Sequence, residues 1–104
     1  MKIVNFAEKN SELNRFVAEI RDIHIQQDRL RFRKNLERIG EVMSYEISKD
    51  FRYSEKLVTT PLGTARVNTA DDKIVIGTIL RAGIPYHQGF LKYFDRAENA
   101  FVSA

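Results

Sequence analysis

The segment KIVIGTIL, residues 73–80, restricts the possible folds of this sequence more than any other feature. Its β-branched residues place apolar side chains on both faces of a strand, which is the pattern of a parallel strand covered on both sides. The loop Arg81-Ala82-Gly83 follows, and Pro85 fits the first turn of a subsequent helix. ENAFVSA, residues 98–104, predicts a second strand. We therefore predict a βαβ unit that starts at residue 73, and an α/β fold.

Two amphipathic helices are predicted before this unit. Ser11 is a plausible N-cap for a short helix that ends at about Arg21, and Asp28 for a longer helix from about Arg29 to Lys49. Apolar side chains recur at helical spacing along the longer helix, at Phe32, Leu36, Ile39, Met43 and Ile47. We expect this stripe to face the core, Gly40 to mark close packing, and Glu37 and Glu41 to lie on the outer face.

The segment after the helices has the features of a β-hairpin. Residues 56–60 and 64–68 read as two short strands, and Pro61 and Gly63 suit a type I turn between them. Apolar and polar residues alternate only weakly along both strands. We therefore expect the hairpin to be exposed or paired with another subunit.

Two parallel strands cannot cover both predicted helices and also bury both faces of KIVIGTIL. We therefore predict that residues 1–104 are the N-terminal portion of a single, larger α/β domain. Its parts would be a helical segment (1–50), a hairpin arm (51–70) and the start of a parallel-sheet core (71–104). The alternative is a small domain that a partner chain completes.

Composition excludes several classes of site. The sequence has no cysteine, which excludes disulfides, thiolate metal sites and thiol nucleophiles. Its apolar runs are far shorter than the roughly 20 residues that span a bilayer, and its N-terminus is not a secretory signal. His24 and His87 are isolated from other metal-ligand types, so each reads as an exposed or core histidine. We predict a soluble, cytoplasmic protein with no membrane partner and assign no catalytic or metal-ligating residue.

The positive charge is concentrated on the longer helix. The net charge is +3, and five basic residues lie within ten positions, at Arg29, Arg31, Arg33, Lys34 and Arg38. Such a run could attract a polyanion, and it is also typical of a solvated helix face. We favour the solvated face and do not predict nucleic-acid binding.

The loop Arg81-Ala82-Gly83 is the candidate binding site. Ligands of open α/β sheets bind beyond the carboxyl ends of the strands, where this loop is predicted to lie. Gly83 lets the backbone approach an anion, the following helix N-terminus adds a favourable field, and Arg81 offers a planar fork of donors. The loop thus has the parts of a phosphate or pyrophosphate site, and a purely structural turn is the alternative.

The sequence resembles the N-terminal half of bacterial-type uracil phosphoribosyltransferase, a type I phosphoribosyltransferase. The matching elements are R-x-R-F-R at the start of the long helix (Arg29, Arg31, Phe32, Arg33), Y-E near its end (Tyr45, Glu46), I-L-R-A-G (Ile79 to Gly83), and a Gly-Phe-Leu segment (Gly89, Phe90, Leu91). The resemblance runs from residue 1 to the end of the sequence.

The resemblance implies a type I phosphoribosyltransferase fold and a reaction of uracil with phosphoribosyl diphosphate. The products are UMP and pyrophosphate, and Mg²⁺ accompanies the donor. Arg81 is implied to hold the pyrophosphate, with the backbone N–H groups of Ala82 and Gly83 nearby. The segment 51–70 resembles the arm that this family uses for dimer contacts, which implies a homodimer.

Two of the family's elements do not occur in this sequence. They are the D-P-x-x-A-T-G-G-S-like loop for the donor's 5-phosphate and the G-x-G-D-A-G-like segment for uracil. We therefore expect the parent protein to be the enzyme and the 104-residue chain alone to be inactive. The alternative is a non-catalytic short relative that binds an anion or RNA through the basic helix 29–38.

Overall fold

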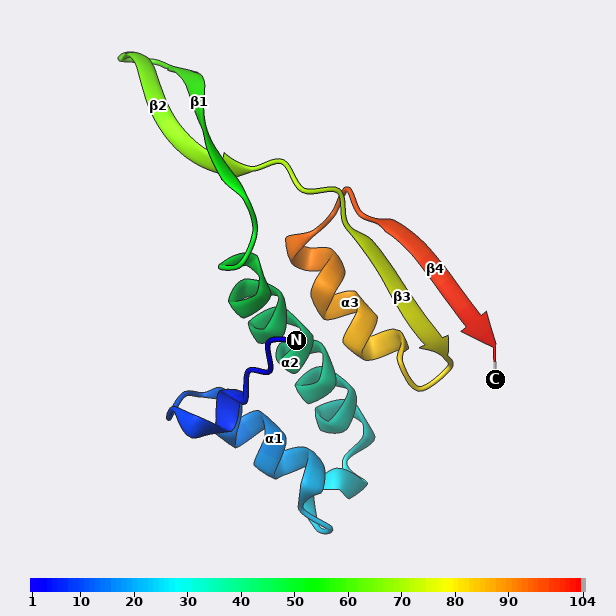
Figure 1. Cartoon of the computed structure of the whole chain (residues 1–104). Helices are drawn as coiled ribbons and strands as arrows, with labels where there is room; N and C mark the ends of the chain where they lie inside the picture. The colour runs from blue at the N-terminus through cyan, green and yellow to red at the C-terminus, as the bar shows by residue number, and fades with distance from the viewer. Residues whose placement is uncertain (104) are drawn as a thin grey trace.

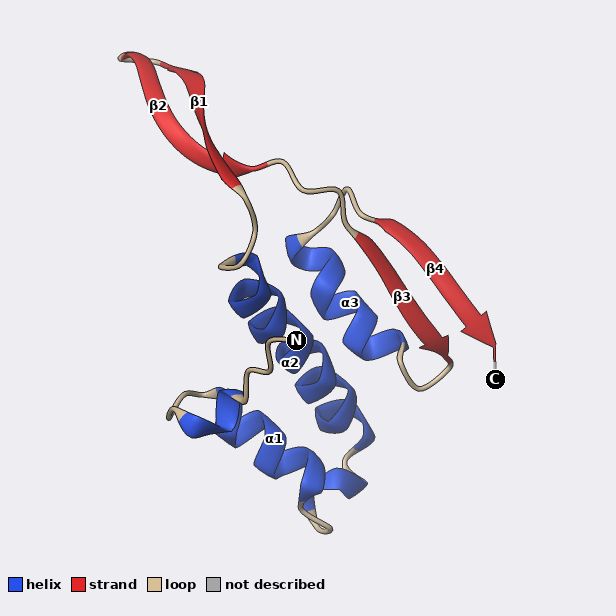
Figure 2. Cartoon of the chain, viewed as in Figure 1, coloured by secondary structure: helices blue, strands red, loops and turns tan. Residues whose placement is uncertain are grey.

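The computed structural model describes residues 1–103, and Ala104 lies outside this range. The helices are α1 (Leu13–Arg21), α2 (Arg29–Ser48) and α3 (Ile84–Tyr93); the strands are β1 (Tyr53–Thr60), β2 (Gly63–Ala70), β3 (Val75–Leu80) and β4 (Glu98–Ser103). Short 3-10 turns at Phe6–Glu8 and Ile25–Gln27 precede α1 and α2. The order of helices, hairpin and strand–helix–strand unit confirms the predicted α/β class (Figure 1; Figure 2).

The two N-terminal helices begin close to the predicted caps. Asp28 is the N-cap of α2, and its carboxylate accepts a hydrogen bond from the Arg31 backbone N–H at 3.1 Å. An acidic N-cap satisfies a first-turn N–H group in this way. The Ser11 hydroxyl accepts from the Leu13 N–H at 3.2 Å, but the N-cap of α1 is Glu12. Ser11 was predicted to be the N-cap itself, but it lies one residue before the N-cap.

Helices α2 and α3 pack closely because two glycines face each other at their contact. A Cβ atom on Gly89 would lie 2.1 Å from the Glu37 carbonyl oxygen and 2.9 Å from the Gly40 Cα. A Cβ atom on Gly40 would lie 2.4 Å from the Tyr86 carbonyl oxygen. No side chain fits at these distances, so the two backbones are in contact, as the prediction of close packing at Gly40 required.

The buried face of α2 differs from the predicted apolar stripe. Ile39 is buried, but Ile47 is exposed and the other stripe residues are half-buried. The buried residues of α2 are Asn35, Ile39, Gly40 and Ser44. The stripe prediction is wrong in this respect because α3 contacts the helix along the face of Gly40, where small and polar residues allow close approach.

Glu37 and Glu41 also lie elsewhere than predicted. The Lys92 Nζ of α3 is 2.5 Å from Glu37 Oε1 and 3.6 Å from Glu41 Oε1. Both carboxylates therefore border the contact between α2 and α3, and the prediction that they lie on the outer face is wrong. Their position is set by a helix that follows much later in the sequence.

A polar cluster joins α1 to α2. The buried Asn35 side chain donates a hydrogen bond to Glu19 Oε2 at 2.8 Å, and its oxygen accepts one from Arg38 Nη1 at 3.2 Å. Arg31 Nη1 donates to the same carboxylate at 2.9 Å. The hydrogen bonds from Asn35 and Arg31 lower the pKa of Glu19 below its ordinary value of 4.5. Directional hydrogen bonds thus accompany the apolar contacts that hold α1 on α2.

Strands β1 and β2 form an antiparallel hairpin that projects away from the helices (Figure 1). Each strand has 8 residues, which is longer than predicted, and Pro61 and Leu62 connect them. Gly63 has a φ of 131°, a conformation that favours glycine. The side chains of Leu57 and Leu62 are 70% and 99% exposed, so the hairpin carries apolar surface into solvent.

Strands β3 and β4 form a parallel pair with α3 packed against it (Figure 1). Ile76 and Thr78 are buried, whereas Val75 and Ile79 on the opposite face are 63% and 67% exposed. The predicted parallel strand is confirmed. The prediction that both of its faces are covered is wrong within residues 1–103, because α3 supplies a layer on one side.

The described chain is an extended stack with a projecting arm. Its radius of gyration is 16.9 Å, whereas a compact domain of this length would have about 13 Å. The buried hydrophobic side chains within residues 1–103 are Leu13, Ile39 and Ile76. The layers run from α1 through α2 and α3 to the sheet (Figure 2).

Candidate functional site

The loop Arg81-Ala82-Gly83 connects the carboxyl end of β3 to the first turn of α3 (Figure 1). The register of the parallel pair places Leu80 beside Ser103, so β3 and β4 end at the same edge. The Leu80–Arg81 peptide bond is cis. Ligands of open α/β sheets bind beyond this edge. The loop therefore lies where a ligand of the sheet is expected.

Backbone hydrogen bonds fold the loop back on β3. The Gly83 N–H donates to the Ile79 carbonyl at 3.2 Å, and the Ile84 N–H donates to the Arg81 carbonyl at 3.1 Å. A Cβ atom on Gly83 would lie 2.7 Å from the Ile79 oxygen and 2.8 Å from the Thr78 Cγ2. Glycine is therefore required at this position to let the loop lie against β3.

Arg81 carries the positive charge of the loop. Its side chain is exposed, and within residues 1–103 no hydrogen bond or ion pair engages the guanidinium. The Ala82 N–H also has no backbone partner in the described chain, whereas the Gly83 N–H is bonded to β3. The loop can thus offer an anion a planar fork of donors and one backbone N–H, next to the positive end of α3.

Tyr86 in the first turn of α3 adds no negative charge near the loop. Its ring meets the Phe90 ring edge-on, with centroids 5.0 Å apart. Burial raises the pKa of the Tyr86 hydroxyl above its ordinary value of 10.0. The phenol is therefore neutral at physiological pH and does not repel an anion bound at Arg81.

The structure places the two histidines in different surroundings. His87 is buried, its Nδ1 is in hydrogen-bond contact with Thr78 Oγ1, and its ring lies 5.0 Å from that of Phe101. His24 is exposed before α2, and its backbone N–H donates to Asp22 Oδ1 at 2.8 Å. The sequence analysis did not single out Thr78. The signal that could have identified it is the alternation of the strand, because Thr78 lies two residues after Ile76 and therefore on the same, buried face.

Within the described range, no group of three His, Asp or Glu side chains could hold a metal ion.

The basic run on α2 is largely engaged within the chain. Arg31 is 2.9 Å from Glu19, Lys34 Nζ is 3.9 Å from Glu37, and the Arg38 guanidinium lies over the Phe16 ring at 5.5 Å. Three of the five basic side chains thus contact neighbouring elements or turns. Arg29, Arg31, Arg33 and Lys34 remain exposed, as the prediction of a solvated helix face expects.

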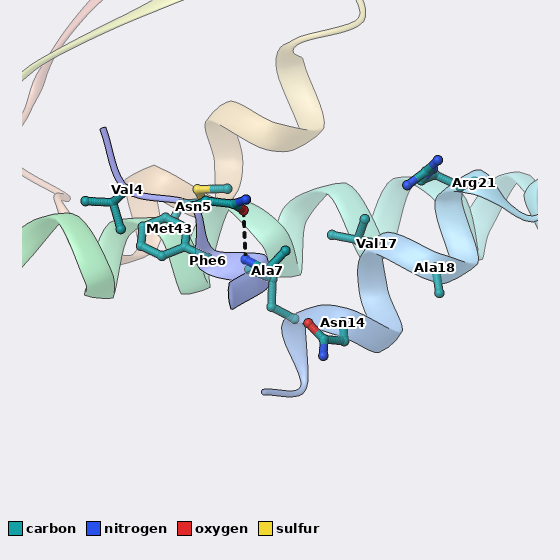
Figure 3. Close-up of a pocket in the computed structure, with 10 residues that line it drawn as sticks. Val4, Asn5, Phe6, Ala7, Asn14, Val17, Ala18, Arg21 and Met43 are labelled. Carbon is teal, nitrogen blue, oxygen red and sulfur yellow. Dashed lines mark hydrogen bonds between the residues drawn. The ribbon is translucent and has the colours of Figure 1, made fainter. Parts of the chain in front are cut away.

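A separate hollow of about 590 Å³ lies between the N-terminal segment, α1 and α2 (Figure 3). Apolar side chains such as Phe6, Val17 and Met43 line it, and Arg21 is its one charged residue. The Asn5 side-chain oxygen accepts a hydrogen bond from the Ala7 backbone N–H at 3.0 Å. This mainly apolar composition does not resemble an anion site.

Comparison with known proteins identifies the family of the chain. The family model described as uracil phosphoribosyltransferase matches residues 7–103. This chain belongs to the uracil phosphoribosyltransferase family. The matched range contains α1, α2, the hairpin and the Arg81 loop, and so covers every element on which the sequence resemblance rests.

Two curated members of the uracil phosphoribosyltransferase family show the extent of the likeness. A uracil phosphoribosyltransferase of Porphyromonas gingivalis is 59% identical over 104 residues, which is 100% of this chain and 48% of that protein. One of Methanothermobacter thermautotrophicus is 41% identical over 75 residues, which is 70% of this chain and 35% of that protein. The chain spans about half the length or less of these relatives.

A solved structure shares the fold of this chain. The AQ2163 protein from Aquifex aeolicus matches with a TM-score of 0.75 and 31% sequence identity, over 89% of this chain and 44% of that one. Together with the family match, this likeness indicates that the chain has part of a phosphoribosyltransferase fold. None of the helices formed by residues 1–103 is both long and apolar enough to span a bilayer.

Proposed function

We propose that this chain supplies the N-terminal portion of a uracil phosphoribosyltransferase. The observation that carries the proposal is the match of the family model to residues 7–103, a range that includes the Arg81 loop. In the proposed reaction, the bond between C1′ of the donor sugar and a pyrophosphate oxygen breaks. A uracil nitrogen forms the new bond to C1′ and loses its proton, which gives UMP and pyrophosphate.

We assign the pyrophosphate of the donor to Arg81, Ala82 and Gly83. The exposed Arg81 guanidinium would bind phosphate oxygens through two parallel hydrogen bonds. Negative charge grows on the departing pyrophosphate as the sugar becomes oxocarbenium-like, so a fixed cation stabilises the transition state more than the ground state. The Ala82 N–H would add a donor, and Gly83 would set the path of the loop.

The proposed enzyme requires parts that this sequence does not contain. We assign residues 1–50, 51–70 and 71–104 to the helical segment, hairpin arm and first part of the sheet of one phosphoribosyltransferase domain. The elements for the 5-phosphate and for uracil do not occur in these 104 residues. We therefore propose that the chain alone is inactive and binds pyrophosphate only weakly.

Mg²⁺ is the metal that we propose accompanies phosphoribosyl diphosphate. The described residues offer no three-ligand cluster of His, Asp or Glu for it. They do not fit a resident metal site, and no residue of this chain is assigned to the ion. The metal would be carried by oxygens of the donor.

The hairpin is the proposed contact with a second copy of the chain. Leu57 and Leu62 expose apolar side chains on an arm that no other described element covers. Burying such surface in a partner would remove it from water. This proposal follows the family's use of the same segment for dimer contacts.

Complementation with a relative tests the proposed function. The chain would be mixed or fused with the part of the Porphyromonas gingivalis protein that it does not match, and uracil-dependent pyrophosphate release would be measured with Mg²⁺ present. We expect activity for the combination and none for either part. Arg81→Ala should lower the rate about 100-fold, the effect of removing one preorganised charge-stabilising donor.

Arg96→Ala is the matched control. Arg96 is also an exposed arginine, but it follows the opposite end of α3. It should leave the rate within about twofold, because surface substitutions have small effects. Equal losses for the two variants, or an active Arg81→Ala combination, would contradict the assignment of the loop.

A further inference from the structure

A side-chain hydrogen bond spans the Arg81 loop from one side to the other. Thr78 lies three residues before Arg81 on β3, and His87 lies four residues after Gly83 on α3. The Thr78 Oγ1 and His87 Nδ1 are in hydrogen-bond contact, and the two residues are 7% and 3% exposed. The strand before the loop is thus fastened to the helix after it by a contact that water does not reach.

The same two residues bear on the backbone of the loop. The His87 backbone N–H donates to the Gly83 carbonyl at 2.9 Å, and Thr78 Cγ2 lies 2.8 Å from the point where a Cβ atom of Gly83 would be. Gly83 itself is bonded to Ile79, the residue after Thr78, at 3.2 Å. A shift of the Thr78–His87 contact would therefore move Gly83 and the neighbouring Ala82.

The other nitrogen of His87 argues against a role in packing alone. His87 Nε2 is buried and has no hydrogen-bond partner within residues 1–103. Its ring lies against Phe101, a contact that an apolar side chain could also make. Because an unpaired buried nitrogen costs stability, an apolar residue would fill this space better than histidine. The Nδ1 contact with Thr78 is the interaction that an apolar residue could not supply.

We propose that Thr78 and His87 are positioning residues, which hold the Arg81-Ala82-Gly83 loop in the arrangement that binds pyrophosphate. Neither side chain contacts the pyrophosphate. Their effect passes through the Gly83 backbone to the Ala82 N–H and to Arg81. The identity of the ligand in this inference rests on the proposed function. The effect of Thr78 and His87 on the loop can be measured without any ligand.

Nuclear magnetic resonance of the ¹⁵N-labelled 104-residue chain tests the inference. The backbone amide resonances of Ala82 and Gly83 would be recorded first without ligand and then during titration with magnesium pyrophosphate. Thr78→Val keeps the shape of the side chain and removes the hydroxyl. His87→Leu keeps an apolar contact with the Phe101 ring and removes both ring nitrogens. Thr78→Ser keeps the hydroxyl, and Thr64→Val makes the same isosteric change on the exposed hairpin.

Thr78→Val and His87→Leu should move both amide resonances before ligand is added. They should also weaken pyrophosphate binding about tenfold, the magnitude of one lost hydrogen bond. The pyrophosphate affinities of Thr78→Ser and Thr64→Val should stay within about twofold of that of the unsubstituted chain, since both variants keep the Thr78–His87 hydrogen bond. His87→Leu also leaves the buried Thr78 hydroxyl without its partner, so its melting temperature would be measured beside its affinity. A loss of affinity larger than the loss of stability separates positioning from packing.

Unmoved amide resonances together with parental affinity in Thr78→Val and His87→Leu would overturn the inference. Circular dichroism would show that each variant is folded, and either variant alone suffices for the comparison. If the unsubstituted 104-residue chain shows no binding even at high concentrations of magnesium pyrophosphate, the proposed function of the loop is contradicted. The ligand-free amide resonances would still decide whether the pair positions the loop.

Discussion

Lys92 shows how one side chain can connect two helices at the residue scale. Its hydrogen bond lowers the pKa of the Glu37 carboxyl below its ordinary value of 4.5, and the same contact raises the pKa of Lys92 above 10.5. A lowered carboxyl pKa stabilises the folded state above the unfolded value, and this stabilisation is lost as pH falls through the folded value. The raised lysine pKa stabilises the folded state below 10.5 and is lost as pH rises further.

Glu37→Gln should therefore destabilise the chain at neutral pH and matter less in acid. The difference in unfolding free energy between parent and variant would be measured by urea denaturation from neutral pH down to about pH 3, because it should shrink once the carboxyl is protonated. Glu12→Gln is the control, since its partner Arg15 lies one turn away in an exposed, local pair. A Glu37 difference that stays constant across this range would contradict the prediction.

Local sequence pattern predicts residues whose partners are near in the chain and misses those whose partners are distant. Asp28 was predicted as an N-cap from its place before the helix, and the N–H group that it caps belongs to Arg31, only three residues later. Glu37 was predicted on the outer face because helical periodicity carries no information on Lys92. The Arg81 loop could be placed at a strand end from its neighbours, whereas the Thr78–His87 contact depends on how α3 returns over β3.

At the element scale, the contact between α2 and α3 decides where the loop lies. α3 packs against β3 on one side and α2 on the other, so α2 supports the helix that begins at the Arg81 loop. Gly40 and Gly89 set the distance between α2 and α3 because neither position has room for a Cβ atom. The elements themselves follow from local start and stop signals. The crossing of α2 and α3 does not, since the sequence predicted close packing at Gly40 but did not indicate that Gly89 lies opposite it.

Gly89→Ala should destabilise the chain by about 1–3 kcal/mol, the usual cost of overpacking a close contact. Its Cβ would lie 2.1 Å from the Glu37 carbonyl oxygen, and backbone atoms cannot move aside as a flexible side chain can. The free energy of unfolding from urea titration is the measurement. Far-ultraviolet circular dichroism would verify that the helices form.

Gly77→Ala is the matched control for the crossing. Gly77 lies in β3, and a Cβ atom there would meet nothing within 4 Å. Alanine should leave stability unchanged or raise it by up to about 1 kcal/mol, because glycine loses more conformational freedom on folding. If the two substitutions had equal effects, the glycines of α2 and α3 would not set the helix distance.

For the whole molecule, the main departure from the sequence prediction is the open face of the sheet. Val75, Ile79 and Val102 form an exposed apolar surface on the side of the sheet away from α3. KIVIGTIL was predicted to be covered on both faces, and its composition fits that environment. The two curated relatives are each more than twice as long as the part that matches this chain.

We expect the isolated chain to self-associate through this face, because exposed strand edges and apolar sheet surface favour pairing with other chains. Sedimentation velocity should show species larger than the 12.1 kDa monomer. The double substitution Val75→Thr and Val102→Thr keeps the β-branched shape and should reduce the largest species. Leu57→Thr changes the hairpin instead. It should leave association through the sheet intact and weaken any dimer formed by the arm.

A monodisperse monomer with a cooperative melting transition would show that the open face of the sheet is stable in water. The expectation that another layer must cover this face would then be contradicted.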